Sequence, residues 1–193
     1  FIQEKAIFNR QPESLDRIVE LANIAINENE EVVAKEILTY LISNAQDLDT
    51  LLRTNDSLLQ IEIKESSNKD YEKINEKFLI LFNQYGTFSQ TLDLQIAYAH
   101  FLGFYYNQTA QATSFLENTL KLPLNDLQKA QVKLELGDIY VLREEFNTAL
   151  VYYTQIQRSL KNSTISQEAR FKVAKTSYYK GDFTWAESQL KIL

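Results

Sequence analysis

Two short segments of this chain carry the same residue pattern at a fixed separation, and this repetition limits the fold more than any other feature. LGFYY at 102–106 and LGDIY at 136–140 each place a glycine after a leucine and a tyrosine three residues later. The two glycines, Gly103 and Gly137, are 34 residues apart. A period of this length is typical of proteins that stack copies of one helical unit, each burying its apolar face against its neighbours.

The residues around the second copy predict a helical hairpin. Gly137 would let the two helices approach closely, and Ala149 is the small residue that this approach demands on the second helix. Tyr140, one helical turn after Gly137, would fill the space beside it, and Phe146 would close the turn between the helices. We expect Tyr153 to pack against the following hairpin.

A third copy is expected at 168–190, in the segment EARFKVAKTSYYKGDFTWAESQL. An alanine replaces the glycine there, and Gly-Asp-Phe forms the turn. The remaining positions of the pattern are Tyr106 in the first copy and Ala174, Gly181, Phe183 and Ala186 in the third.

The rest of the chain has the same helical character. Apolar residues recur at steps of three and four almost throughout, which predicts about ten helices joined into five hairpins. With 4 Gly and 2 Pro, the chain has too few turn-forming residues for a protein of many short strands. We therefore predict an all-α, right-handed solenoid of antiparallel hairpins over 1–193, with degenerate hairpins over 1–90 and regular repeats over 91–193.

Several residues predict where individual helices begin and end. Gly86 is expected to end a helix in the left-handed conformation, and Pro123 is expected to stop a helix that starts near residue 109. Ser89, Asp126 and Ser166 are expected to begin the helices that follow them.

The pattern Leu-Gly-x-x-Tyr, with alanine on the second helix, resembles the tetratricopeptide-repeat family. The resemblance is strongest over 130–190, fair over 97–122 and weak over 1–90. It departs from the family at three positions where a bulky residue is usual, Ala99, Lys133 and Arg170. The segment from 133 onward also resembles long repeat proteins of Bacteroidetes-type bacteria, which implies a bacterial protein and export.

Members of this family generally bind peptides or partner domains on the concave face formed by the first helix of each hairpin. By alignment, the resemblance implies a protein-binding face made of His100, Phe101, Phe104, Asn107, Gln131, Leu134, Glu135, Asp138, Phe171, Lys172, Lys175 and Tyr178. The three phenylalanines would either anchor apolar side chains of a partner or be buried against neighbouring helices. Glu135 and Asp138, in the middle of the face, argue against a clamp for a terminal carboxylate.

Little in the sequence points to catalysis. The chain has a single histidine, His100, and no cysteine, which excludes disulfides, thiolate zinc sites and cysteine nucleophiles. The carboxylates lack the spacing of a calcium loop, and no phosphate-binding glycine motif or serine-nucleophile motif occurs. We predict a non-enzymatic protein with no catalytic residue, no cofactor and no metal.

Charge and hydropathy limit the classes of partner that the chain can have. The net charge of −6 disfavours nucleic acid, which requires a basic face. The charge is uneven, with a net −7 over 1–65 and +2 over 166–193, and marks either solvated helix faces or a surface that steers a partner. No apolar run is long enough to span a membrane.

The favoured function is therefore a scaffold for protein–protein interaction. One alternative is an assembly module, a homo-oligomer that associates through the ends of the solenoid. A second alternative is the helical region of a larger enzyme. Because the sequence starts at Phe1 and contains no Met, we predict a piece of a longer protein, with any export signal outside it.

Overall fold

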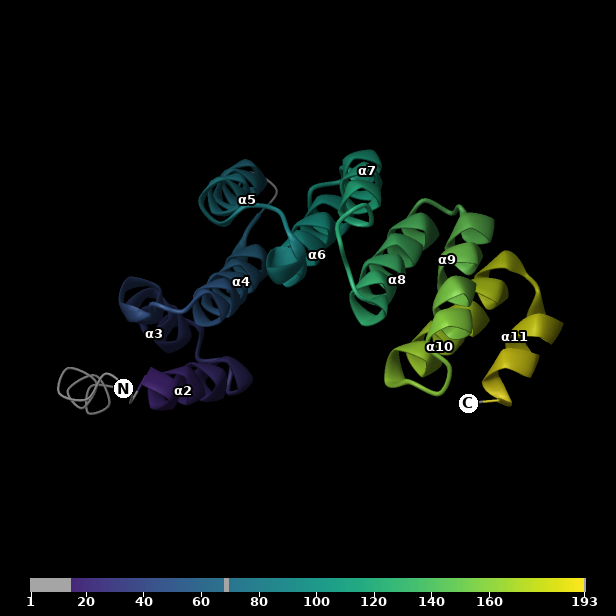
Figure 1. Ribbon diagram of the computed structural model, residues 1–193, viewed down its shortest axis with the longest axis horizontal. Helices are drawn as coiled ribbons and strands as arrows, with labels where there is room; N and C mark the ends of the chain where they lie inside the picture. Colours follow the sequence, from purple (N-terminus) through teal and green to yellow (C-terminus); the bar gives the residue numbers. More distant parts are fainter. Residues whose placement is uncertain (1–14, 68–69, 193) are drawn as a thin grey trace. The chain divides into compact units, whose positions relative to one another are not determined.

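The computed structural model describes residues 15–67 and 70–192, and over these residues it contains ten α-helices and no strand (Figure 1). The predicted all-α class and the predicted number of helices are thus confirmed. The chain divides into two compact units, Phe1–Ile74 and Asn75–Leu193.

The first unit is built from α2 (Leu15–Asn27), α3 (Glu31–Asn44), α4 (Leu48–Glu65) and the start of α5 (Tyr71–Tyr85). Its buried core cluster consists of Ile18, Ala22, Ala25, Ala34, Ile37, Leu38, Leu41 and Ile61. Two ion pairs connect α3 to α4 on the surface of this unit, one between Lys64 and Glu31 and one between Lys35 and Glu65. The core residues of α2 and α3 recur at steps of three and four, so the apolar spacing in the sequence corresponds to the buried stripe of these helices.

The second unit contains three helical hairpins, preceded by the greater part of α5. The hairpins are α6 (Leu92–His100) with α7 (Thr109–Thr119), α8 (Asp126–Leu142) with α9 (Phe146–Ser159), and α10 (Thr164–Lys180) with α11 (Phe183–Leu190). The first helix of the middle hairpin, α8, also contacts the first helices α6 and α10. These three first helices therefore form one continuous layer of the unit.

Aromatic side chains form the core where α5 meets α6 and α7. The rings of Phe78 and Tyr98 lie 5.1 Å apart, and Tyr98 in turn lies 5.1 Å from Phe115 in an edge-to-face arrangement. Phe101 stacks on Phe78 at 5.6 Å and is fully buried. A side chain without exposed surface cannot contact a partner, so the prediction that Phe101 is a binding residue is wrong. Its place is in the core, the alternative that the sequence left open.

The two glycines of the repeat pattern have different roles. A β-carbon on Gly137 would lie 2.2 Å from Cε1 of the Tyr153 ring, so this glycine does allow close approach within one hairpin. Tyr153 thus packs against α8 inside its own hairpin, and its packing against the next hairpin stays a prediction. Gly103 instead lies in a π-helical turn, Phe101–Tyr105, and its nearest neighbour would be Ile139 of the next hairpin, at 3.3 Å.

The helix ends agree with the sequence in part. Gly86 follows α5 with a φ of 78°, and Gly181 follows α10 with a φ of 88°, so both end a helix in the left-handed conformation. Asn125, not Asp126, caps α8, because its side chain accepts a hydrogen bond from the backbone N–H of Gln128 and its own backbone is extended.

Two further helix starts and one helix end also differ from the prediction. Ser163 caps α10 by accepting from the N–H of Ser166, which lies inside the helix. Ser89 lies in a 3-10 turn, Ser89–Thr91, held by the Thr91 hydroxyl, which accepts from the N–H of Phe88. The helix α7 ends at Thr119, so Pro123 lies in the following link and is not its terminator.

Candidate protein-binding face

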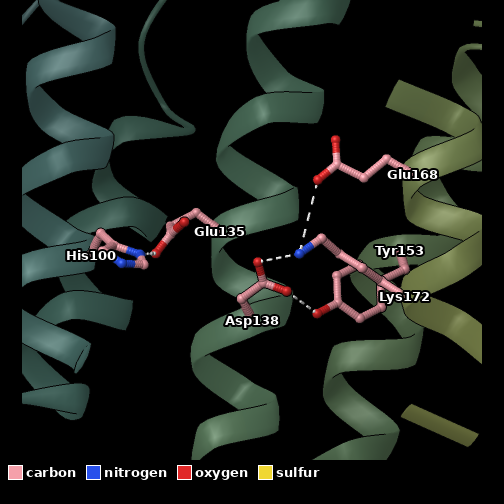
Figure 2. A network of polar contacts seen from close by, with 6 residues as sticks. All are labelled: His100, Glu135, Asp138, Tyr153, Glu168 and Lys172. Atoms are coloured by element: carbon pink, nitrogen blue, oxygen red, sulfur yellow. Dashed lines mark hydrogen bonds and ion pairs between the residues drawn. The ribbon is translucent and has the colours of Figure 1, made fainter. Parts of the chain in front are cut away.

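Four of the predicted binding residues take part in polar contacts that connect the first helices of the second unit. His100 lies at the end of α6, Glu135 and Asp138 lie one turn apart on α8, and Lys172 lies on α10 (Figure 2). Their separation along the sequence follows from the repeat, since equivalent positions of stacked hairpins share one face.

His100 joins α6 to α8. Its Nδ1 is 2.9 Å from Oε1 of Glu135, and its ring stacks on that of Phe104 with centroids 4.4 Å apart. The hydrogen bond with Glu135 raises the pKa of His100 above the usual 6.5, with smaller support from the charges of Glu135 and Asp138, against burial and the charge of Lys172. The protonated form, in which Nδ1–H donates to the carboxylate, therefore persists to higher pH than in a free histidine.

Asp138 connects three helices. Its Oδ1 accepts a hydrogen bond of 2.6 Å from the hydroxyl of Tyr153 on α9, and its Oδ2 accepts one of 2.6 Å from Nζ of Lys172 on α10. The same Nζ lies 3.9 Å from Glu168 (Figure 2). Burial, followed by the charge of Asp138, raises the pKa of Tyr153 above its ordinary value, so this hydroxyl stays protonated and acts as a donor.

These contacts fix the spacing of the first helices. The polar groups that form the contacts are already paired with one another. What remains exposed is mainly aromatic. Phe104 is 41% exposed, Phe171 52% and Tyr178 61%. Large aromatic rings at this exposure are the side chains most often found as anchors in protein interfaces.

The aromatic residues of α10 lie close to one another and to a lysine. The rings of Tyr178 and Tyr179 are 6.2 Å apart, and that of Tyr178 is 5.3 Å from Phe183 at the start of α11. The ammonium group of Lys175 lies 5.8 Å from the centre of the Tyr179 ring. A cation above an aromatic ring is weakly attracted to it, so the ring helps to hold this ammonium group beside it.

The other predicted residues are placed as follows. Asn107 is exposed, with a φ of 57°, directly after the π-helical turn, and Gln131 and Leu134 on α8 are partly buried. The π-helical turn also exposes Tyr105, which the sequence reasoning missed. No pattern in LGFYY distinguishes a π-helical turn from an α-helix, because both have helical backbone angles.

The remaining residues of the repeat pattern serve the packing of the hairpins. Tyr106 stacks on Phe101 at 5.6 Å, and Tyr140 stacks on Tyr152 at 5.6 Å. Ala149, Ala174 and Ala186 are buried, and Phe146 and Phe183 each begin the second helix of a hairpin.

Two further findings bear on the chemistry of the face. Within 15–67 and 70–192, no group of three or more histidines and carboxylates is placed to hold a metal ion. None of the helices in the described part of the chain combines the length and the apolar character that crossing a bilayer demands.

No protein-family model and no curated protein matches the sequence. Solved structures are similar in fold. BtubC (BKLC) from P. vanneervenii has a TM-score of 0.72 at 15% identity, over 98% of this chain and 83% of that one. A putative kinesin light chain from P. anserina, with nearly identical repeats, has a TM-score of 0.67 at 16% identity, over 93% and 92% of the two chains.

PlcR from Bacillus thuringiensis, solved in complex with the peptide PapR7 and DNA, has a TM-score of 0.68 at 12% identity, over 94% of this chain and 70% of that one. Identity at this level establishes a shared fold and not a shared function. The predicted fold of repeated helical hairpins is thereby confirmed.

Proposed function

We propose that this chain, whose fold is tetratricopeptide-repeat-like, is a non-catalytic scaffold that binds a partner protein or peptide on the layer of first helices α6, α8 and α10. The observation that carries the proposal is the exposure of Phe104, in the turn that follows α6, and of Phe171 and Tyr178 on α10. Aromatic anchors beside a fixed polar network are the expected composition of a binding surface.

Rigidity supports the same proposal. The contacts of His100 with Glu135, and of Asp138 with Lys172, each join two neighbouring first helices. A face that is already ordered before binding loses less conformational entropy when a partner docks. The similar fold of PlcR was solved with a bound peptide, which makes a peptide a reasonable class of partner for this chain.

The chemistry of the polar groups favours binding over catalysis. His100 and Lys172 already hydrogen bond to carboxylates, and the hydroxyl of Tyr153 is buried against Asp138. We therefore propose that the network holds the helices in place and that the partner contacts the aromatic residues beside it.

The test is selection of peptides from a displayed random library on the immobilised protein. The groove variant is Phe104→Ala with Phe171→Ala and Tyr178→Ala, and the matched control is Val151→Ala with Ile80→Ala, which removes exposed apolar side chains from α9 and α5. Helicity of both variants is checked by circular dichroism. Binding is then measured with synthetic copies of the selected peptides.

We expect the groove variant to bind these peptides at least about tenfold more weakly than the parent, because each interface anchor contributes about 1–2 kcal/mol. The control should bind as the parent does. Selection of no peptide, or equal binding by the parent and the groove variant, would contradict the proposed face.

A further inference from the structure

The exposed face of α10 combines aromatic rings with positive charge. We define the α10 strip as Phe171, Lys175, Tyr178 and Tyr179, which recur at helical spacing and are all exposed. Lys175 has no carboxylate within ion-pair distance among the described residues. The whole helix carries four basic residues and one acidic residue, and of the basic residues Lys172 is paired with Asp138 and Glu168.

The start of α3 has the opposite character. We define the α3 corner as Glu28, Glu30, Val32 and Glu36, all exposed, with Val32 exposed to 82%. These three glutamates form no ion pair within the described part of the chain, whereas the lysines Lys35 and Lys64 of this unit are paired with other carboxylates. The corner therefore combines an exposed aliphatic side chain with glutamates that form no ion pair within the described residues.

We propose that the α10 strip of one molecule binds the α3 corner of a second copy of this chain. In this arrangement Val32 would pack among the aromatic rings of the strip, and Lys175 would face the glutamates of the corner. The inference rests on the proposed function, because the strip is the α10 part of the same binding layer, and it names the partner.

Charge complementarity selects this occupant. The described residues of the first unit carry a large excess of carboxylates, and α10 carries the clearest excess of basic residues in the second unit. Opposite fields on two separate surfaces of one chain steer copies of that chain toward each other. Because the two surfaces differ, the contact is heterologous, and each bound copy leaves one strip and one corner open for further copies.

The test is sedimentation velocity of the protein over a range of concentrations. We expect the weight-average mass to rise with concentration at low salt. Association should weaken as the salt rises from about 0.01 M to about 0.15 M, since the screening length falls from about 30 Å to about 8 Å. Lys175→Glu and, separately, Glu28→Lys with Glu36→Lys should each weaken association at least about tenfold by placing like charges together.

Matched controls reverse exposed charges elsewhere. Lys161→Glu and Glu76→Lys lie outside both surfaces and should associate as the parent does. A mixture of the strip variant with the corner variant should regain association, because the intact strip meets the intact corner and the two reversed surfaces again carry opposite charges. Circular dichroism and the fluorescence of Trp185 verify that every variant is folded.

A parent protein that stays monomeric at low salt, or a corner variant that associates as well as the parent, would overturn the proposal. The peptide selection then separates the two ideas. If peptides still bind the parent and not the groove variant, the binding face stands and its partner is another protein. If no peptide binds and the protein is monomeric, both proposals fail.

Discussion

Replacing Gly137 with alanine tests the packing of the middle hairpin. The added β-carbon would lie 2.2 Å from Cε1 and 2.6 Å from Cζ of the Tyr153 ring. Carbon atoms in contact normally lie 3.5–4.0 Å apart, so the ring would have to move by about 1 Å or more. Tyr153 is fully buried, and its hydroxyl is held by Asp138 at 2.6 Å, so the movement has little room and breaks a hydrogen bond.

The magnitude follows from three contributions to the free energy of unfolding. Overpacking of a buried ring costs about 1–3 kcal/mol. Weakening the hydrogen bond between Tyr153 and a carboxylate costs up to about 1.5–3 kcal/mol. The higher helix propensity of alanine returns about 1 kcal/mol. With the hydrogen bond lost, these contributions sum to about 1.5–5 kcal/mol, and we expect Gly137→Ala to lower the free energy of unfolding by an amount in this range.

The assay is urea unfolding followed by the fluorescence of Trp185, the single tryptophan of the chain, which lies on α11 of the same unit. The matched control is Gly103→Ala, whose β-carbon would lie no closer than 3.3 Å to Ile139 and should cost less than about 1 kcal/mol. A second control combines Gly137→Ala with Tyr153→Leu. The smaller side chain makes room, so the two substitutions together should cost less than the sum of their separate effects.

An unfolding free energy for Gly137→Ala within about 0.5 kcal/mol of the parent would refute the reasoning, since it would mean that helix propensity outweighs the steric conflict. Strict additivity with Tyr153→Leu would refute it as well, because the ring would then not be the obstacle.

Three further predictions concern the titratable groups of the second unit. The hydrogen bond to Glu135 raises the pKa of His100 above 6.5, so the stabilisation of the folded protein by protonated His100 is complete below pH 6.5 and is lost as the pH rises through the raised pKa. Urea unfolding at a series of pH values should show a loss of about 0.5 kcal/mol in the free energy of unfolding of the parent, and no such loss in His100→Gln. Asp138→Ala should lower the free energy of unfolding by about 2 kcal/mol and Asp138→Asn by about half of that, because only asparagine keeps an acceptor for the tyrosine hydroxyl, and equal costs would contradict this. Burial, aided by a carboxylate, raises the pKa of Tyr140 to about 12, so an ultraviolet titration of Tyr140→Phe should lose absorbance change near pH 12 and none near pH 10.

The architecture was accessible from the sequence because the signals for it are local and repeated. Apolar spacing identifies each helix, and Gly137 with Ala149 identifies a close hairpin, since few residue types tolerate that approach. Gly86 ends its helix in the left-handed conformation as expected, and Gly181, expected in a turn, does the same, because glycine adopts a positive φ without strain.

The details of the binding face were less accessible because they depend on neighbours that no local pattern specifies. The two LG motifs are alike in sequence, yet the π-helical turn around Gly103 directs this glycine toward the next hairpin. Phe101 and Phe104 lie three residues apart in an apolar segment, yet Phe101 is buried against Phe78 of α5 and against Tyr106, while Phe104 is exposed.

The network around Asp138 connects the packing of the hairpins with the details of the binding face. The repeat places Asp138 and Lys172 on neighbouring first helices, and the glycine before Asp138 brings Tyr153 close enough to donate to it. One residue thus joins the packing inside a hairpin to the spacing between hairpins. A substitution at Gly137 should therefore alter not only stability but also the position of Lys172 beside the α10 strip, because Tyr153 and Lys172 share the same carboxylate. Gly137→Ala could lower the free energy of unfolding and yet leave peptide binding by the folded protein unchanged. The packing of the hairpin and the binding face would then be independent, and the network would be a structural link with no influence on that face.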